Sequence, residues 1–259
     1  MKDIQNLKDN RNVDIQKVGI KHLELPLIIQ RKNSSNQVVC AKAKVSVSLP
    51  RDYKGTHMSR FVEVLTEWQH KNLLGVDIKG CLEKIIHNLD AQSGELEFKF
   101  PYFIDKKSPV KGMVAPMSYH CSFEGRIEND EYKFILGVEV PVTTLCPCSK
   151  EISDNGAHNQ RAFIKIKVSY DESEQVWIED LVDLIESCAS CPVYPLLKRE
   201  DEKFVTEKAW DNPKFVEDVL RDVVVKLRNH PIINEFDVEC EAFESIHNHS
   251  AWAFQHEVK

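Results

Sequence analysis

The sequence predicts an α+β fold built from two halves, each with the element order strand-strand-helix-helix-strand-strand. Two observations predict it. Stretches in which apolar and polar side chains alternate, as in strands with one buried face, come in pairs. Between the pairs lie stretches whose apolar residues recur at helical spacing. This order typically gives antiparallel sheets with the helices packed on one face.

The first half follows a polar stretch of mixed charge, residues 1–13, which we expect to be a flexible tail. Its clearest strand is Ala41–Leu49, where small and branched apolar residues alternate with lysine and serine until Pro50 ends it. The first module is predicted to span residues 14–128. Its expected elements are strands near 20–29 and at 41–49, helices at 61–68 and 78–89, and strands at 95–100 and 113–127.

The second half, residues 129–259, repeats this order without repeating the residues. Asn212 has a side chain typical of a helix N-cap and Pro213 suits the first helical position, so the last helix is expected to begin there. Two such modules would leave sheet edges open, and assembly into a closed barrel would cover them. The expected elements are strands at 134–142 and 164–170, helices at 178–185 and 213–227, and strands near 238–242 and at 251–258.

Composition and charge narrow the classes of function. The net charge of −7 argues against a broad nucleic-acid surface, which needs an excess of lysine and arginine. No apolar stretch is long enough to span a bilayer and the N-terminus does not resemble a signal peptide, so we expect a cytoplasmic protein without nucleic-acid or membrane partners. The eight cysteines are then not expected to form a disulfide framework. A small anionic substrate is compatible with this net negative charge, because its binding needs only a local basic pocket.

The densest polar cluster lies in a loop between two predicted strands. It contains Cys146-Pro147-Cys148 and, twelve positions after Cys146, His158. Thiolate and imidazole bind zinc and similar divalent metals, and a loop of this length can present both to one ion. An ordinary turn with a buried cysteine and an exposed histidine explains these residues equally well. A further interpretation is a closed structural zinc site formed by Cys146, Cys148, Cys188 and Cys191.

A second cluster, Glu244 with His247 and His249, precedes the last strand. At strand spacing the two histidines would project from the same face. A glutamate with two histidines can bind metal or transfer protons near neutral pH. A polar hairpin tip exposed to water is the simpler interpretation, although three such groups within six residues favour a function.

Three other residues have ordinary explanations from the sequence alone. Glu202 lies in the charged run 198–203, which has the composition of a loop. Glu217, early in the last helix, would pair on the surface with Arg221 at i,i+4. Arg60 follows Ser59 at the start of the first helix, where free amides can bind phosphate but an ordinary helix start is the better interpretation.

Several long motifs occur along the chain: Leu49–Arg60, Leu145–Lys150 with His158–Arg161, Leu196–Glu202, Asp211–Pro213 with Phe215–Asp218, and Glu244–His249. Together they resemble the prokaryotic GTP cyclohydrolase I family of type IB, from about Val18 to the C-terminus. The resemblance implies a bimodular tunnelling fold and homotetramers with active sites at subunit interfaces. It also implies the conversion of GTP and water to 7,8-dihydroneopterin triphosphate and formate, the first step of folate biosynthesis.

The resemblance also implies roles for single residues. One divalent metal ion per site, Zn²⁺ or Mn²⁺, would be held by Cys146, His158 and Glu202, with Glu200 as the alternative to Glu202. Such an ion lowers the pKa of water toward ~7, which would let hydroxide attack C8 of guanine. Cys146 therefore also counts among the catalytic residues.

The remaining implied roles concern the substrate. Glu217 would anchor the guanine, reversing its surface interpretation, because a carboxylate can accept two hydrogen bonds from the N–H edge of the base. The catalytic and substrate-contacting residues would be Glu244, His247 and His249. Lys150, Arg161 and Arg60 are candidates for the triphosphate. Two rival functions remain: a protein of this fold that binds a purine or pterin without catalysis, and the structural four-cysteine zinc protein.

Overall fold

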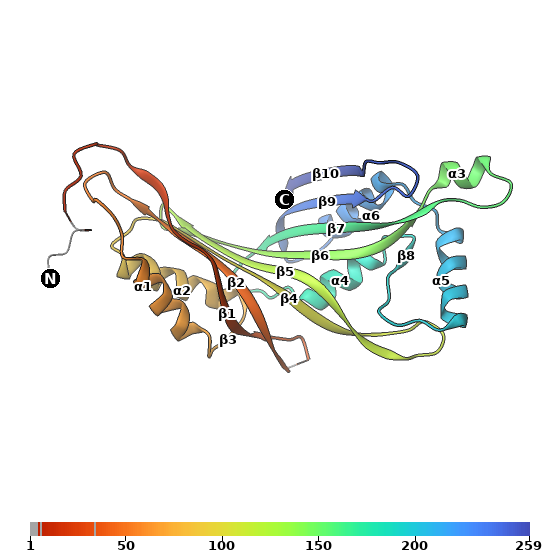
Figure 1. The fold of residues 1–259 in the computed structure, drawn as a ribbon, viewed down its shortest axis with the longest axis horizontal. Coiled ribbons are helices and arrows are strands. Elements are labelled where there is room, and N and C mark those ends of the chain that lie inside the picture. The colour runs from red at the N-terminus through yellow and green to blue at the C-terminus, as the bar shows by residue number, and fades with distance from the viewer. Residues whose placement is uncertain (1–4, 6, 34) are drawn as a thin grey trace. The chain divides into compact units, whose positions relative to one another are not determined.

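The computed structural model describes residue 5, residues 7–33 and residues 35–259. It confirms the predicted α+β class, since the described chain forms a mostly antiparallel sheet accompanied by helices (Figure 1). The elements are β1 (Ile15–Gln30), β2 (Asn36–Leu49), α1 (Met58–Trp68), β3 (Asn72–Leu73), α2 (Gly75–Asn88), β4 (Gly94–Lys107), β5 (Val114–Glu128), β6 (Glu131–Leu145), α3 (Pro147–Ile152), β7 (Asn159–Tyr170), α4 (Ile178–Glu186), β8 (Cys191–Pro192), α5 (Arg199–Asp211), α6 (Val216–Arg228), β9 (Ile233–Ala242) and β10 (Ala251–Val258).

The chain divides into two compact units, and strands β4, β5 and β6 contribute residues to both. The first unit comprises Met1–Pro101 and Ser122–Leu136, and the second comprises Tyr102–Cys121 and Gly137–Lys259. The strand order is β3-β1-β2-β4-β5-β6 in the first unit and β4-β5-β6-β7-β9-β10 in the second. The two units share strands and do not follow the repeated order of elements on which the predicted modules are based. The predicted module boundary near residue 128 therefore stays a prediction.

The first unit packs α1 and α2 on its sheet. Helix α1 contacts β1 and α2, and α2 begins at Gly75 against the ring of Phe134. A Cβ at Gly75 would lie 2.4 Å from that ring, so only glycine allows this approach. Phe123 packs edge-to-face on both Phe134 and Phe100, with ring centroids 5.7 and 5.1 Å apart. These apolar contacts form the core that the alternation of the strands predicted.

Part of the predicted N-terminal tail lies outside the described residues, namely residues 1–4 and 6. The described part contacts the segment between β2 and α1. Lys8 forms a bridge with Tyr53, and the Asp9 N–H donates to the Asp52 carbonyl at 3.2 Å. Residues 8 and 9 therefore have backbone partners in this segment, and the flexibility of the tail stays a prediction.

A buried carboxylate in the first unit gives a testable dependence of stability on pH. Glu95 is 7% exposed and accepts hydrogen bonds from Lys17 and, at 3.1 Å, from Lys44. Burial alone would raise its pKa, but the two lysines outweigh burial and the pKa lies below the usual 4.5. The folded state therefore gains stability from the ionised form, which is present above pH 4.5 and is lost as the pH falls through the lowered pKa.

We expect Glu95→Gln to lower the free energy of unfolding by about 1–2 kcal/mol at pH 7, because two charge-assisted hydrogen bonds are weakened. The difference from the parent should shrink as the pH falls below 4.5. Urea denaturation at pH 7 and pH 4 measures both values. Glu24→Gln is the matched control, since Glu24 pairs with Lys42 at 3.5 Å with both side chains exposed and should contribute little. A difference that stayed constant with pH would contradict this account.

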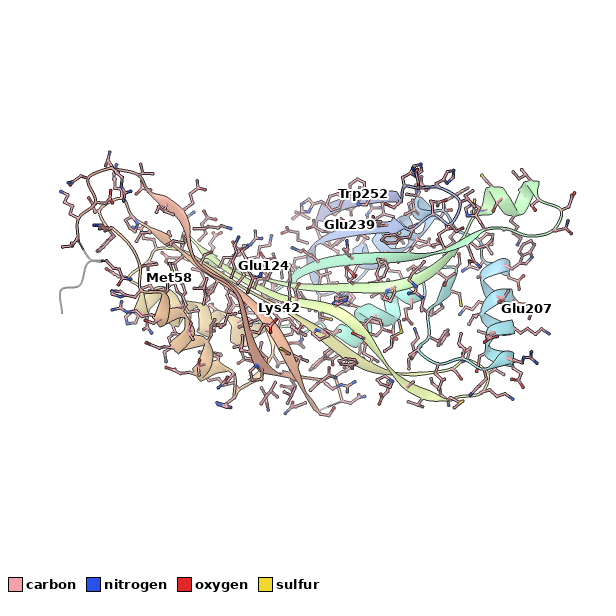
Figure 2. The ribbon with its side chains drawn as sticks, in the orientation of Figure 1. Lys42, Met58, Glu124, Glu207, Glu239 and Trp252 are labelled. Atoms are coloured by element: carbon pink, nitrogen blue, oxygen red, sulfur yellow. The ribbon has the colours of Figure 1, made fainter. Side chains whose placement is uncertain are left out.

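The second unit buries one face of its strands beneath α6 and α4. Alternate residues of β7 and β9 are buried, and α6 packs on β9 and β10 while α4 contacts α6. The opposite face carries charged pairs such as Lys165 with Glu239, 2.8 Å apart on adjacent strands. Figure 2 labels Glu239 on β9. Strands β7 and β9 pair in the register Ala162–Ala242 through Ser169–Glu235. This register places the start of β7 beside the end of β9.

Three local predictions were wrong. Asn212 does not begin the last helix: it follows the end of α5, and its side-chain amide donates to the carbonyls of Ala189 and Ser190. Helix α6 begins instead at Val216. The charged run 198–203 is not a loop, because α5 begins within it at Arg199. The Cys146 loop contains a short helix, α3, whose N-cap is Cys146 and whose first residue is Pro147.

Candidate functional site

Most of the predicted site residues lie at one end of the second unit. Cys146 directly follows β6, His158 directly precedes β7, and the loop carrying Glu244 follows β9. Strands β6, β7 and β9 are neighbours in the sheet, so these three positions meet at the same edge. A hydrogen bond of 2.9 Å from the Phe243 N–H to the Arg161 carbonyl joins the loop after β9 to the start of β7.

The two ends of the Cys146 loop are joined by hydrogen bonds. The Cys146 N–H donates to the His158 carbonyl at 3.1 Å. Ser149 holds both ends: its N–H donates to the Cys146 Sγ at 3.4 Å, and its Oγ accepts from the His158 N–H at 3.2 Å. The loop therefore folds back as the sequence predicted and brings the cysteine and the histidine to one place.

The His158 ring is oriented by Gln160. Its Nδ1 lies 3.0 Å from the Gln160 Oε1, and this nitrogen can donate a hydrogen bond to that oxygen. The lone pair of Nε2 is then available. Metal-binding histidines are typically oriented in this way, with the second nitrogen donating to a fixed oxygen. Gln160 can therefore orient His158 in the way that a metal ligand requires.

The acidic run at the start of α5 places its three members in different environments. Glu200 pairs with Lys111 at 2.7 Å. Asp201 is fully buried and accepts three backbone hydrogen bonds. Glu202 is exposed and forms no side-chain hydrogen bond or ion pair within the described chain. Glu202 therefore has no side-chain partner in the described chain, whereas Glu200 has one, and the choice between the two as a ligand stays a prediction.

The segments that carry Cys146, His158 and Glu202 contact one another through apolar neighbours. Leu145, which precedes Cys146, is buried with Ala209 of α5 in one hydrophobic cluster. Ala157, which precedes His158, and Val205, one helical turn after Glu202, pack against the same cluster. Helix α5 is therefore held beside the Cys146 loop.

Within a single chain these contacts do not complete a metal site. Over residues 5, 7–33 and 35–259, no three His, Cys, Asp or Glu side chains come close enough together to hold an ion. This holds for Cys146, His158 and Glu202, and equally for the alternative set of four cysteines. In that set Cys188 and Cys191 are buried whereas Cys148 is exposed.

Glu217 lies in the first turn of α6, next to the Cys146 segment. The Lys214 N–H, just before α6, donates to the Leu145 carbonyl at 3.0 Å. Burial raises the pKa of the Cys240 thiol on β9 to about 12, and the charge of Glu217 contributes to this rise. The predicted ion pair with Arg221 does not form, because Arg221 contacts Asp218 at 3.5 Å. The carboxylate of Glu217 remains exposed at the site end of the unit.

The loop between β9 and β10 carries the other acid–base residues. The His247 Nδ1 lies 3.3 Å from a Glu244 carboxylate oxygen. The rings of His247 and His249 stack, with centroids 5.1 Å apart and planes 13° from parallel. The two histidines lie side by side as predicted, although the loop has no strand geometry there. A carboxylate that contacts an imidazole can orient it and stabilise its protonated form.

The three predicted phosphate-binding residues have separate surroundings. The ammonium of Lys150 donates to the Trp210 carbonyl and lies 4.6 Å from the centre of that indole ring, linking α3 to α5. Arg161 is exposed at the start of β7. Arg60 belongs to the first unit, where its guanidinium donates to the Asn88 carbonyl at 2.9 Å and lines a pocket of about 360 Å³.

Sequence reasoning missed three residues at this site. Ser149 and Gln160 fall within quoted motifs but received no role, because a serine and a glutamine in a loop give no signal without their partners. Asp201 had a recognisable signal. An acid three residues after a helix N-cap typically accepts its backbone N–H, and Asp201 accepts the Lys198 N–H at 3.0 Å. Residues 198–203 have the composition of a loop, so the sequence predicts no helix N-cap there and therefore no capping acid.

Comparison with solved structures supports the fold. The fold is similar to solved uricases: one from Bacillus fastidious (TM-score 0.57, 10% identity, 94% of each chain covered) and one from Arthrobacter globiformis (TM-score 0.54, 8% identity, 94% of this chain and 93% of that one). At such identities the likeness concerns the tunnelling fold alone. No helix within the described ranges is long and apolar enough to cross a membrane.

Sequence comparison is more specific. The chain is 51% identical to the GTP cyclohydrolase FolE2 of Geotalea uraniireducens over 253 residues, covering 98% of this chain and 92% of the relative. It is 50% identical to the enzyme of the same name from Thermosipho africanus, covering 98% and 96%. A family model described as type I GTP cyclohydrolase folE2 matches residues 1–253. The chain therefore belongs to the type I GTP cyclohydrolase FolE2 family.

Proposed function

We propose that the protein is a GTP cyclohydrolase I that converts GTP and water to 7,8-dihydroneopterin triphosphate and formate, at the start of folate biosynthesis. The observation that carries this proposal is the convergence of Cys146, His158, Glu217 and the Glu244–His247 pair at one end of the second unit. Membership of the FolE2 family supports the same reaction.

The residues of this site suit the steps of the reaction. The exposed Glu217 carboxylate can accept hydrogen bonds from N1–H and the 2-amino group of guanine, which holds C8 in a fixed place. Opening of the imidazole ring requires a proton on the departing nitrogen, and we propose His247, whose Nδ1 contacts Glu244, as its source. His249 stacks on His247 and limits the movement of its ring. Arg161, Lys150 and Arg60 are our candidates for the triphosphate.

We propose that one divalent ion, Zn²⁺ or Mn²⁺, is held by Cys146, His158 and Glu202. The donor set fits: thiolate, imidazole and carboxylate are ligands that both ions accept, and His158 presents its Nε2. When bound, the ion would supply a Lewis acid that lowers the pKa of water. Because a single chain does not bring the three side chains together, the set would be completed by movement of Glu202 on α5 or by a neighbouring subunit.

The purified protein should release formate from GTP and form a fluorescent pterin when Zn²⁺ or Mn²⁺ is present. A chelator should abolish both signals, and the metal that restores the higher rate identifies the working ion. Formate is measured enzymatically and the pterin by fluorescence after oxidation. Tight binding of GTP without formate release under any metal would favour the alternative, a purine-binding protein without catalysis.

We propose that four chains assemble with sites at the subunit interfaces. Strand β10 ends the strand order of the second unit and pairs with β9 alone in the described chain. Trp252 and Phe254 on it are 59% and 47% exposed and their rings stack. Figure 2 labels Trp252 on this strand. An open edge with exposed aromatic residues is typical of a surface that another chain covers.

Light scattering should therefore give about 120 kDa, four times 29.9 kDa. Trp252→Glu should reduce this mass, because it places a charge at the contact. Val225→Glu is the control, since Val225 is exposed on α6. A mass of one chain for the parent protein would contradict the assembly.

We infer that the protein works in the cytoplasm. All eight cysteines are free thiols, as expected in a reducing compartment. With a net charge of −7, we propose GTP, rather than a nucleic acid or a membrane surface, as its partner.

A further inference from the structure

The turn between α4 and β8, residues 187–190, contacts both the end of β6 and the segment before α6. On the β6 side, the Oγ of Ser190 accepts the Leu145 N–H at 3.2 Å, and Ser190 is fully buried. On the α6 side, the side-chain amide of Asn212 donates to the carbonyls of Ala189 and Ser190 at 2.9 and 3.3 Å. This α4–β8 turn therefore joins the end of β6 to the segment that leads into α6.

Lys214 connects three elements at the same place. Its N–H donates to the Leu145 carbonyl at 3.0 Å. Its ammonium donates to the Cys188 carbonyl of the α4–β8 turn at 2.8 Å and to the Asp222 carboxylate of α6 at 2.5 Å. The side chain is only 17% exposed, which is unusual for a lysine that has no partners. These three hydrogen bonds therefore define where the chain enters α6.

Helix α6 depends on such contacts for its exact position. Its buried residues, among them Val219 and Val223, pack on β9 and β10. Hydrophobic burial has no preferred direction, whereas a hydrogen bond fixes both a distance and an angle. Apolar packing therefore holds α6 on the sheet, and the hydrogen bonds of Lys214 fix where its first turn lies relative to the end of β6.

Glu217 lies in this first turn, three residues after Lys214. Its carboxylate is exposed and forms no hydrogen bond or ion pair within the part of the chain that the structure describes. No other side chain therefore holds the carboxylate in place, and its position follows the backbone of the first turn. A shift of this turn would move the carboxylate by the same amount.

We propose that Lys214 is a positioning residue that places Glu217 for recognition of the guanine base, by fixing the start of α6 to the end of β6 and to the α4–β8 turn. This inference rests on the proposed role of Glu217 as the guanine anchor. Lys214 itself would not contact the substrate. Its effect would pass through the backbone from residue 214 to residue 217, so it should appear as a change in the choice of base.

The test measures the preference for GTP over inosine triphosphate (ITP), which keeps the N1–H of guanine and lacks the 2-amino group. ITP is added as a competitor of GTP, and its inhibition constant is divided by the KM for GTP. This ratio does not depend on the fraction of the protein that is folded or active. The parent should prefer GTP by about 10-fold or more, because the 2-amino group can donate a hydrogen bond to the Glu217 carboxylate.

Lys214→Met keeps the length of the side chain and removes the ammonium. We expect the preference for GTP to fall about 5-fold or more, toward that of Glu217→Gln, because a small misplacement of a positioning group has a large effect. Lys226→Met is the matched control. Lys226 also donates to the α4–β8 turn, at the Ser187 Oγ, but it belongs to the last turn of α6. It should keep the parental preference.

Asp222→Asn provides a second variant in case Lys214→Met does not fold. It weakens only the α6 end of the link, so the preference should fall in the same direction by a smaller factor. If Lys214→Met, or Asp222→Asn in its place, kept the parental preference, Lys214 would be a structural residue only and the proposal would be wrong. If Glu217→Gln itself kept that preference, Glu217 would not be the guanine anchor, and the positioning role would fail with it.

Discussion

Replacement of Cys146 by serine is expected to remove metal binding and GTP turnover while leaving the fold intact. The Cys146 Sγ accepts the Ser149 N–H at the start of α3, and serine is a preferred residue at this N-cap position. The local structure should therefore persist. A serine hydroxyl stays protonated near neutral pH and is a poor ligand, whereas a cysteine binds metal as the thiolate. Loss of a Lewis acid that contributes several kcal/mol predicts a fall in kcat on the order of 10³-fold or more.

Cys148→Ser provides the matched control for this prediction. Cys148 lies two residues farther in the same short helix and is exposed, so the control makes the same chemical change without removing a proposed ligand. The metal content of both variants is measured by elemental analysis, and turnover by formate release. Equal loss in the two variants would indicate damage to the loop rather than removal of a ligand. A Cys146→Ser variant with full metal content would contradict the ligand assignment.

The fold could be predicted where the sequence has a clear period. Strand β7 contains the predicted strand 164–170, where apolar residues alternate with lysine and serine, and α4 follows its apolar stripe. Helix α5 was missed because it is charged on most of its surface and buries only Asp201 and Ala209 completely. Without an apolar stripe, a helix that is held by its ends has no periodic signal in the sequence.

Contacts within one loop of the candidate site could be predicted from the sequence. Contacts between residues far apart in the chain could not. The loop length allows Cys146 and His158 to meet, and a backbone hydrogen bond joins the two residues in the structure. The place of Glu217 beside this loop depends on the Lys214–Leu145 contact, which joins residues far apart in the chain. Its assignment came from family resemblance, and the family match confirms that family. The individual roles of the site residues stay predictions.

Burial also could not be read from composition. The acidic run 200–202 contains three carboxylates that look equivalent in the sequence. In the structure one is paired, one is buried and one is exposed. The difference arises because the β4–β5 turn offers two N–H groups to Asp201, and only the tertiary structure brings that turn to α5.

Glu217→Gln should severely impair the use of GTP without affecting the metal. Glutamine retains one acceptor oxygen, but its NH₂ group would face a donor on the guanine edge, so two charge-assisted hydrogen bonds become at most one neutral bond. Such bonds contribute about 1.5–3 kcal/mol each, which predicts a fall in kcat/KM on the order of 10³-fold. Metal affinity should equal that of the parent, because Glu217 is an anchor and not a ligand.

Arg221→Ala separates this role from the surface ion pair that the sequence alone suggested for Glu217. Arg221 contacts Asp218 at 3.5 Å with both side chains substantially exposed, and such pairs contribute little. Arg221→Ala should therefore keep kcat/KM close to that of the parent. The decisive comparison is GTP against ATP, because ATP lacks the N–H edge that Glu217 is proposed to bind. Glu217→Gln should lose most of the preference for GTP. If it kept both that preference and the parental KM, the guanine would have to be held by another residue at this end of the second unit.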